Sequence, residues 1–161
     1  MSNVVVTDLD GTLVRVGVEH MEALSEGLPE YHRVVKWAEP NNRLARILEA
    51  HREKGRTVVA VTARDTRWAP VTRWWLKVNL PGLADIPLYM RAMGDERPDH
   101  LVKVELLERV VADHGEIGYF HDDHPENIAL AESLGVANIT RHNGYEENKK
   151  ALEAAIRGNS K

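Results

Sequence analysis

The chain has 161 residues, of which 43% are hydrophobic, and 25 acidic against 21 basic side chains give a formal net charge of −4. A chain of this length can bury about two-thirds of its unfolded surface, so we expect one domain over residues 1–161. The absence of cysteine excludes disulfides, zinc–thiolate sites and a cysteine nucleophile. The negative charge argues against a broad non-specific nucleic-acid binder, although a local basic patch is compatible with it.

The sequence also bears on location. No apolar run approaches the roughly 20 residues of a membrane span, and the first residues lead directly into an expected strand without a signal segment. Lack of cysteine fits a reducing compartment. We therefore expect a cytoplasmic protein with no membrane partner, and the sequence gives no indication of its oligomeric state.

The first expected strand, residues 3–8, ends in the motif Asp8-Leu9-Asp10-Gly11-Thr12. Alternate residues of an extended segment face the same way, so Asp8 and Asp10 can share one site at the carboxyl end of the strand. Two such acids repel unless a cation or a proton lies between them. The motif predicts a divalent metal beside a phosphoryl group. The plainer alternative is an Asp-Gly turn whose acids cap the next element.

Helices are expected next at 20–37 and 41–54, with Asn41 and Asn42 as N-cap candidates and Gly55 as a helix breaker. Residues 14–40 leave room only for a small helical flap, which predicts an open site that can admit a polymer end as well as a small phosphate ester. A second strand, 57–62, ends in the hydroxyl of Thr62. That hydroxyl could bind a phosphate oxygen or could simply be an N-cap.

A helix at 67–79, a strand at 86–90 and a helix at 99–114 follow, with Asp99 as N-cap and Gly115 as breaker. Lys103 lies early in the last of these helices and is a candidate ligand for phosphate oxygens. The alternative interpretation of Lys103 is a solvated surface lysine.

The strand at 117–121 runs into Asp122 and Asp123, which are candidates to complete a metal shell. A helix at 124–134, the breaker Gly135, a strand at 136–139 and a helix at 144–157 end the pattern. His121 and His124 flank the acid pair and are interpreted as loop and helix-entry residues, because Mg²⁺ prefers oxygen ligands. Strand–helix alternation with Val- and Ile-rich strands predicts an α/β fold with a doubly wound parallel sheet. All of these motifs would then meet at one edge of that sheet.

Taken together, the motifs at Asp8–Thr12, Thr62, Lys103 and Asp122-Asp123 resemble those of the haloacid dehalogenase superfamily, from Val4 to about Thr140. The resemblance implies a Rossmann-like phosphatase with little or no cap domain. It implies Asp8 as the nucleophile that forms an aspartyl phosphate, with Asp10 as general acid and base. Thr62 and Lys103 would bind the phosphoryl group, and Mg²⁺ would be held by Asp8, the Asp10 carbonyl, Asp122 and Asp123.

Within the superfamily, four segments resemble the 3′-phosphatase domain of phage polynucleotide kinase/phosphatase: residues 62–65, 70–76 with a Thr-Arg-x-Trp helix, 86–91, and 97–103. This implies a 3′-phosphorylated DNA or RNA end as substrate. The chain has no Gly-x-x-x-x-Gly-Lys-[Ser/Thr] loop, so 5′-kinase activity is absent from it and a separate kinase or ligase is an expected partner. Residues 15–39 do not match that domain.

Arginines near the motifs could bind further phosphates, and tryptophans could stack bases. The candidate substrate ligands are Arg64, Arg91 and Arg97, with Arg67 and Arg73 in the same segments. For Arg64 the alternative is a structural salt bridge. For the tryptophans of these segments the alternative is packing in the core; they are Trp68, Trp74 and Trp75.

Two other functions stay open at this point. A phosphatase acting on nucleotides or other small metabolites is slightly favoured by the negative charge. A phosphoacceptor signalling module, which stores phosphate without hydrolysing it, also uses acids, Thr and Lys on a doubly wound sheet. In such modules the acid pair comes first and the acceptor later, the reverse of the order here.

Overall fold

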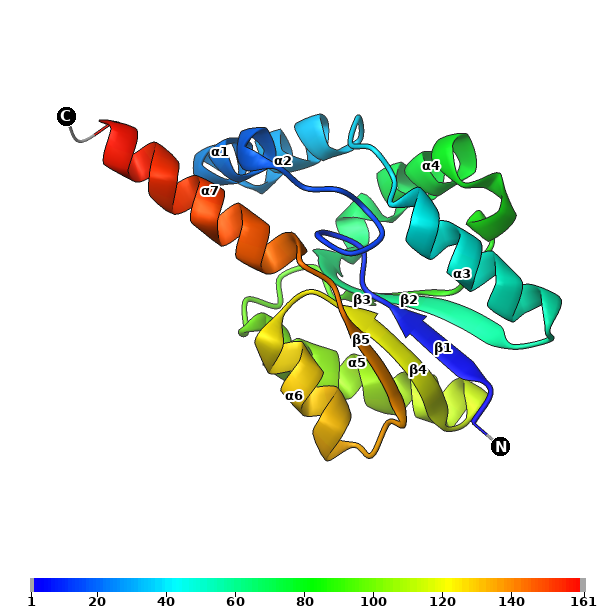
Figure 1. The fold of residues 1–161 in the computed structure, drawn as a ribbon. Helices are drawn as coiled ribbons and strands as arrows, with labels where there is room; N and C mark the ends of the chain where they lie inside the picture. Colours follow the sequence, from blue (N-terminus) through cyan, green and yellow to red (C-terminus); the bar gives the residue numbers. More distant parts are fainter. Residues whose placement is uncertain (1, 160–161) are drawn as a thin grey trace.

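The structure is a computed structural model and describes residues 2–159. Its centre is a sheet of five parallel strands in the order β3-β2-β1-β4-β5 (Figure 1). The strands are β1 (Val4–Thr7), β2 (Thr57–Asp65), β3 (Leu88–Arg91), β4 (Ile117–Asp122) and β5 (Asn138–Arg141). The predicted α/β fold with a doubly wound parallel sheet is confirmed.

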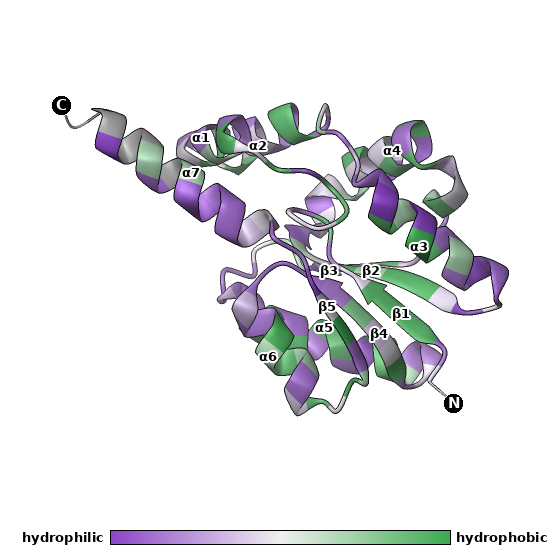
Figure 2. Ribbon diagram, viewed as in Figure 1, coloured by the Kyte–Doolittle hydropathy of each residue, from purple (hydrophilic) through white to green (hydrophobic). Residues whose placement is uncertain are grey.

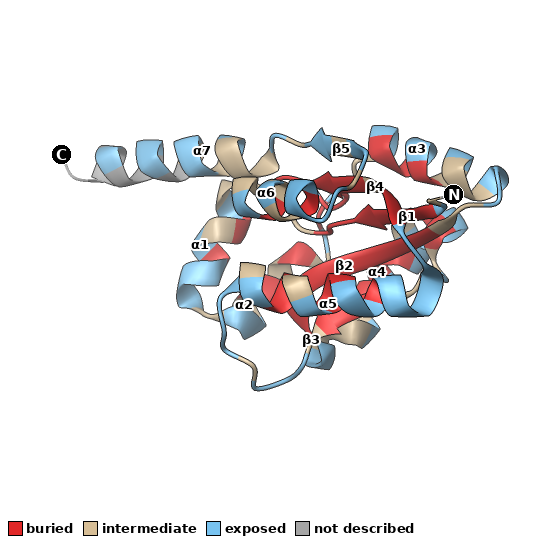
Figure 3. Cartoon of the chain, turned by 90° about the horizontal axis from the view of Figure 1, so that it is seen from below, coloured by how far each residue is buried: buried red, intermediate tan, exposed pale blue. Residues whose placement is uncertain are grey.

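Helices cover both faces of the sheet, which explains why its central strands are mostly buried and mostly hydrophobic up to their carboxyl ends (Figures 2 and 3). On β1, Val5 packs into one core cluster with α3 (Asn42–Glu53) and α4 (Ala69–Asn79). The neighbouring Val4 and Val6 pack into a second cluster with α5 (Asp99–His114) and α6 (Pro125–Ser133). Alternate side chains of one strand therefore hold two layers of helices.

Between β1 and α3 lies a two-helix insertion, defined here as residues 15–39, with α1 (Val18–Glu26) and α2 (Leu28–Val35). The single helix predicted over 20–37 is wrong. Gly27 breaks it at a φ of 126°, a conformation that side-chain-bearing residues rarely adopt, and Pro29 follows within the first turn of α2. The small helical flap predicted for residues 14–40 is present.

The insertion leaves and rejoins the body through a short stem. Val14 forms a bridge with Pro40, and backbone N–H groups of Arg15 and Asn41 donate to the carbonyls of Glu39 and Leu13. The C-terminal end of the insertion is also tied to α4, because the indole nitrogen of Trp75 donates to the carbonyl of Ala38 at 2.8 Å. Both ends of the insertion are thus fixed to the sheet domain.

Other predicted bounds need small corrections. The strand predicted at 57–62 extends to Asp65, and those predicted at 86–90 and 136–139 begin at Leu88 and Asn138. Asp99 is the first residue of α5 rather than its N-cap, which is Pro98. The side chain of Asn41 does cap α3, accepting from the Leu44 N–H. The last helix, α7 (Gly144–Asn159), begins as predicted and extends away from the sheet past α1 (Figures 1 and 3).

No helix within residues 2–159 combines the length and apolar character that a membrane crossing needs.

Candidate active site

The loop that follows β1 brings its acids to the carboxyl edge of the sheet. The backbone N–H of Asp8 donates to the carbonyl of His121 at 2.9 Å, which joins this loop to β4. Gly11 turns the chain at a φ of 83° and approaches Asp123 so closely that a Cβ atom would lie 2.1 Å from a carboxylate oxygen. A side chain at position 11 would therefore displace the Asp123 carboxylate.

Three carboxylates converge where β1 and β4 end. Asp8, Asp122 and Asp123 each offer an oxygen atom within 4.8 Å of the others, and all three residues are buried. The Thr12 hydroxyl donates to Asp8 at 3.2 Å. These residues, Asp8, Asp122 and Asp123, are called the acid cluster below. A set of buried carboxylate oxygens suits a hard divalent cation.

Lys103 lies inside the acid cluster, not at the surface. Its ammonium nitrogen is 2.9 Å from an Asp8 oxygen and 2.7 Å from an Asp122 oxygen, and its side chain is 4% exposed. It is the fifth residue of α5, so the start of that helix projects the side chain over the sheet edge. Although burial alone would lower the pKa of Lys103, the two carboxylates raise it, and the ammonium stays charged.

The acid cluster carries more negative charge than one lysine can balance. Burial, and then repulsion from Asp122, raise the pKa of Asp8 well above its ordinary value despite the contact with Lys103. Burial also raises the pKa of Asp123. For Asp122, burial is outweighed by Lys103 and by hydrogen bonds from the His124 N–H and the Asn127 amide, so its pKa is lowered. A divalent cation would relieve the remaining repulsion.

Asp10, two residues after Asp8 on the same loop, is held by Arg64. The guanidinium donates from Nε at 2.8 Å and from Nη2 at 2.6 Å to the two carboxylate oxygens, a bidentate pair. Burial alone would raise the pKa of Asp10, but Arg64 outweighs it and the Tyr31 hydroxyl on α2 adds to the effect, so the pKa is lowered. Asp10 is therefore ionised in the free protein.

An irregularity in β2 places Arg64 against Asp10. Thr62 pairs with Met90 and Asp65 with Arg91, so two residues of β2, Ala63 and Arg64, bulge out where β3 continues without a gap. The Thr62 hydroxyl accepts from the backbone N–H of Arg64 at 3.1 Å and supports the bulge. Without the bulge, the regular alternation of a strand would fix a different direction for the Arg64 side chain.

The other predicted substrate ligands also have partners within the protein. Arg91 donates to the carbonyls of Ala63, Asp95 and Arg97 and pairs with Asp99. Arg97 pairs with Asp95 and Glu105 on the surface. These bonds brace the loop between β3 and α5. A role of Arg64, Arg91 or Arg97 in substrate binding stays a prediction.

The tryptophans and histidines discussed in the sequence analysis lie in different environments. Trp75 is buried in the core, Trp74 is partly exposed, and the ring of Trp68 stacks on His32 of α2. His121 lies in β4 and not in a loop, and it contacts His142, which directly follows β5. The His124 side chain caps α6, as a helix-entry residue should.

The comparisons with known proteins agree with this geometry. The family described as the polynucleotide kinase PNKP phosphatase domain matches residues 2–144, most of the chain. The chain belongs to this family. It is thus a phosphatase domain of the haloacid dehalogenase type. The comparison with curated protein sequences gives no match.

Solved structures share the fold of this phosphatase domain at low identity. A chain of the Pnkp1/Rnl/Hen1 RNA repair complex has a TM-score of 0.68 and 21% identity over 86% of this chain and 41% of that one. A class C acid phosphatase from Bacillus anthracis, with tungstate bound, has a TM-score of 0.61 and 15% identity over 89% and 68%. A hydrolase from Streptococcus pneumoniae TIGR4 has a TM-score of 0.58 and 13% identity over 94% and 98%. The domain spans about two-fifths of the Pnkp1 complex chain.

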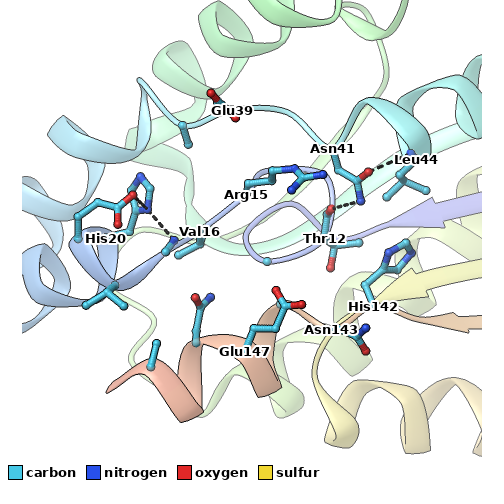
Figure 4. A pocket seen from close by; sticks show the side chains of 18 of the residues that line it. Thr12, Arg15, Val16, His20, Glu39, Asn41, Leu44, His142, Asn143 and Glu147 are labelled. Atoms are coloured by element: carbon cyan, nitrogen blue, oxygen red, sulfur yellow. Dashed lines mark hydrogen bonds and ion pairs between the residues drawn. The ribbon is translucent and has the colours of Figure 1, made fainter. Parts of the chain in front are cut away.

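A cavity of about 1130 Å³ adjoins the acidic loop of the phosphatase domain at Gly11 and Thr12 (Figure 4). Its walls come from the insertion, the start of α3 and the segment that leads into α7. Arg15 lies on the loop side and Glu147 on the α7 side, so its lining carries both charges. The acids of the cluster are not among the described residues that line it. The cavity is therefore a neighbour of the acid cluster and not part of it.

The site contains four further residues that the sequence analysis does not predict as members of it: Thr12, Tyr31, Thr72 and Asn127. Thr12 is the last residue of the Asp8–Thr12 motif, and Asn127 lies one helical turn beyond the second acid pair, so spacing indicates both. Tyr31 lies in the insertion, where the sequence gives no motif. Thr72 belongs to the Thr-Arg-x-Trp helix and hydrogen-bonds to Arg64.

Proposed function

We propose that this phosphatase domain is a Mg²⁺-dependent polynucleotide 3′-phosphatase that works through an aspartyl-phosphate intermediate. The observation that carries the proposal is the buried arrangement of Asp8 between Lys103 and the remaining acids of the cluster, with Asp10 two residues away. An ammonium held at the reacting carboxylate can bind the phosphate oxygens of a substrate placed there.

In the proposed reaction, Asp8 attacks phosphorus in line and the ester oxygen leaves. Lys103 and the Thr62 hydroxyl bind the equatorial oxygens, on which the charge is spread. Asp8, Asp122 and Asp123, with the Asp10 carbonyl, would hold Mg²⁺. The cation would neutralise charge on the nucleophile and on the phosphate when it is bound.

Asp10 would give a proton to the leaving alcohol and later take one from the water that hydrolyses the aspartyl phosphate. In the free protein Arg64 keeps this carboxylate ionised. The donated proton therefore has to reach Asp10 in the substrate complex, where the negative charge of the incoming phosphate would raise the pKa of this carboxyl. Arg64 uses three of its five N–H donors on Asp10 and Thr72, so it would contact the substrate phosphate through the other two while it still holds Asp10.

Support for a polynucleotide substrate comes from the family. Two of the structural neighbours are chains of an RNA repair complex with Rnl and Hen1, so a kinase or ligase is the partner that we propose. Arg91 and Arg97 would contact the polymer only by exchanging their present partners. A single-domain organisation and a cytoplasmic location remain predictions from the sequence.

The test is phosphate release from 3′-phosphorylated DNA and RNA oligonucleotides, compared with 3′-nucleoside monophosphates, sugar phosphates and p-nitrophenyl phosphate. Each substrate is assayed with Mg²⁺, with Ca²⁺ and with excess chelator. We expect Mg²⁺-dependent release with the highest kcat/KM on oligonucleotides. A preference for mononucleotides or sugar phosphates would replace the polynucleotide proposal by the small-molecule phosphatase. A stable phosphoprotein without turnover would indicate the signalling module.

A further inference from the structure

Thr72 contacts Arg64, the partner of Asp10, although the proposed reaction gives Thr72 no role. It lies in the first turn of α4 and is 1% exposed. Its hydroxyl oxygen accepts from Nη1 of Arg64 at 3.0 Å and donates to the carbonyl of Trp68 at 2.8 Å. Thr72 therefore connects α4 to the guanidinium that binds Asp10.

The direction of the Thr72 hydroxyl is fixed by this arrangement. A hydroxyl has one hydrogen and two lone pairs, and the hydrogen is used on the Trp68 carbonyl one helical turn back. The lone pairs are left for Arg64, which has only donors. The hydroxyl is thus held as an acceptor and cannot rotate away without losing the bond to Trp68.

The guanidinium of Arg64 is planar, so contacts on two of its edges fix its orientation. One edge, Nε and Nη2, grips both oxygens of Asp10, while Nη1 is anchored on Thr72. With the Thr72 hydroxyl removed, the plane of Arg64 would be held by Asp10 alone. The pair could then tilt together, and the carboxylate would lose its defined position.

We propose that Thr72 is a positioning residue for Asp10 and acts through Arg64. The inference rests on the proposed function, in which Asp10 transfers the proton to the leaving group. It explains why a threonine stands in the first turn of the Thr-Arg-x-Trp helix. The other two named positions of the Thr-Arg-x-Trp motif have structural partners: Arg73 binds the carbonyls of Ala84 and Ile86, and Trp75 binds that of Ala38.

A positioning role and a merely structural one predict different kinetics. If Thr72 only stabilises α4, its loss slows all substrates by the same factor. If it positions Asp10, its loss slows substrates whose leaving group needs a proton, such as a 3′ sugar alcohol. An ester that leaves as a stable anion, such as p-nitrophenyl phosphate, needs no proton in the step that forms the aspartyl phosphate, so its kcat/KM is spared. Hydrolysis of the intermediate also uses Asp10 and is common to both substrates, so kcat does not separate the two roles.

The test compares Thr72→Val, which removes the hydroxyl at nearly constant shape, with Thr72→Ser, which keeps it. Thr57→Val, at the opposite end of β2, is the matched control. For Thr72→Val we expect kcat/KM on a 3′-phosphorylated oligonucleotide to fall roughly 10-fold, and that on p-nitrophenyl phosphate to fall less than about 2-fold. Thr72→Ser should restore the oligonucleotide activity, and Thr57→Val should match the wild-type protein.

Equal losses on both substrates, no loss for Thr72→Val, or no recovery for Thr72→Ser would each overturn the inference. Thermal unfolding of every variant shows whether it is folded at the assay temperature. Asp10→Asn, measured on the same pair of substrates, separates this result from the function itself. If Asp10→Asn shows no dependence on the leaving group, the proton-transfer role of Asp10 fails, and the proposal for Thr72 falls with it.

Discussion

Asp8 and Asp10 stand two residues apart on one loop, yet the protein treats them in opposite ways. Asp8 is crowded by two further acids and its pKa is raised, even though Lys103 touches it. Asp10 is matched by Arg64 with two hydrogen bonds, and its pKa is lowered. Around Asp8 the acids outnumber the cationic side chains, whereas around Asp10 the charge of the carboxylate is balanced by Arg64. The number of acids in a motif therefore says little about the charge that each of them carries.

The difference follows from the elements that surround each acid. The half around Asp8 is built from β4 and α5, which contribute Asp122, Asp123 and Lys103. The half around Asp10 is built from the β2 bulge, α4 and α2. An unbalanced half can receive a cation and a dianionic phosphate together, whereas a balanced half can hold a carboxylate in place for proton transfer.

The largest effect is expected from Asp8→Asn, which removes the proposed nucleophile and keeps its shape. Turnover should fall by roughly 10⁴-fold or more on every phosphomonoester, because an amide does not attack phosphorus. Steady-state phosphate release with saturating Mg²⁺ measures this. Activity near that of the wild-type protein would remove Asp8 from the mechanism and, with it, the functional contrast between the two acids.

Smaller effects of opposite sign are expected on stability in the absence of divalent cations. Asp8→Asn should raise the free energy of unfolding at pH 7 by about 1 kcal/mol, because it relieves repulsion in the acid cluster while Lys103 keeps Asp122. Asp10→Asn should lower the free energy of unfolding, because Arg64 is left as a buried charge without its partner. Urea unfolding in chelator measures both, and a shift of the same sign in the two variants would contradict the comparison.

The smallest effect is a pH dependence of the Asp10 pair. Because the folded-state pKa of Asp10 is depressed, the pair contributes stability above the unfolded value of about 3.9, and this is lost as the pH falls through the folded value. The stability difference between wild type and Asp10→Asn should therefore be constant from about pH 7 to 5 and shrink toward pH 3. Urea midpoints at these three pH values test it, and a difference that grew on acidification would reverse the assignment of charge.

The sheet and the acid cluster can be predicted from the sequence. Runs of β-branched residues mark β1, β2 and β4, and parallel strands necessarily bring their carboxyl ends to one edge. Acids at those ends, such as Asp8 directly after β1 and Asp122 as the last residue of β4, are therefore predicted to lie together from the sequence alone. Lys103 was placed from the order of the motifs and from its position early in a helix.

The contacts around Asp10 could not be predicted in the same way. Whether Arg64 binds Asp10 or a substrate depends on a bulge of two residues, and strand periodicity does not reveal a bulge. The break of the insertion at Gly27 was missed because apolar residues continue on both sides of it, although the glycine and Pro29 were visible. Contacts of Tyr31 and Thr72 depend on how α2 and α4 pack, which is tertiary information.

The stem of the insertion has a consequence for how this fold can change. Because Val14 and Pro40 are bridged, the insertion is a loop whose ends are already closed by the sheet domain. Lengthening such a loop is inexpensive, since each doubling adds only about 0.6 kcal/mol of closure entropy. Segments of quite different size could be exchanged at this stem while β1 and its acids stay in register. The stem thus lets the insertion vary in size around a fixed β1, and any replacement has to supply again the hydroxyl that Tyr31 directs at Asp10.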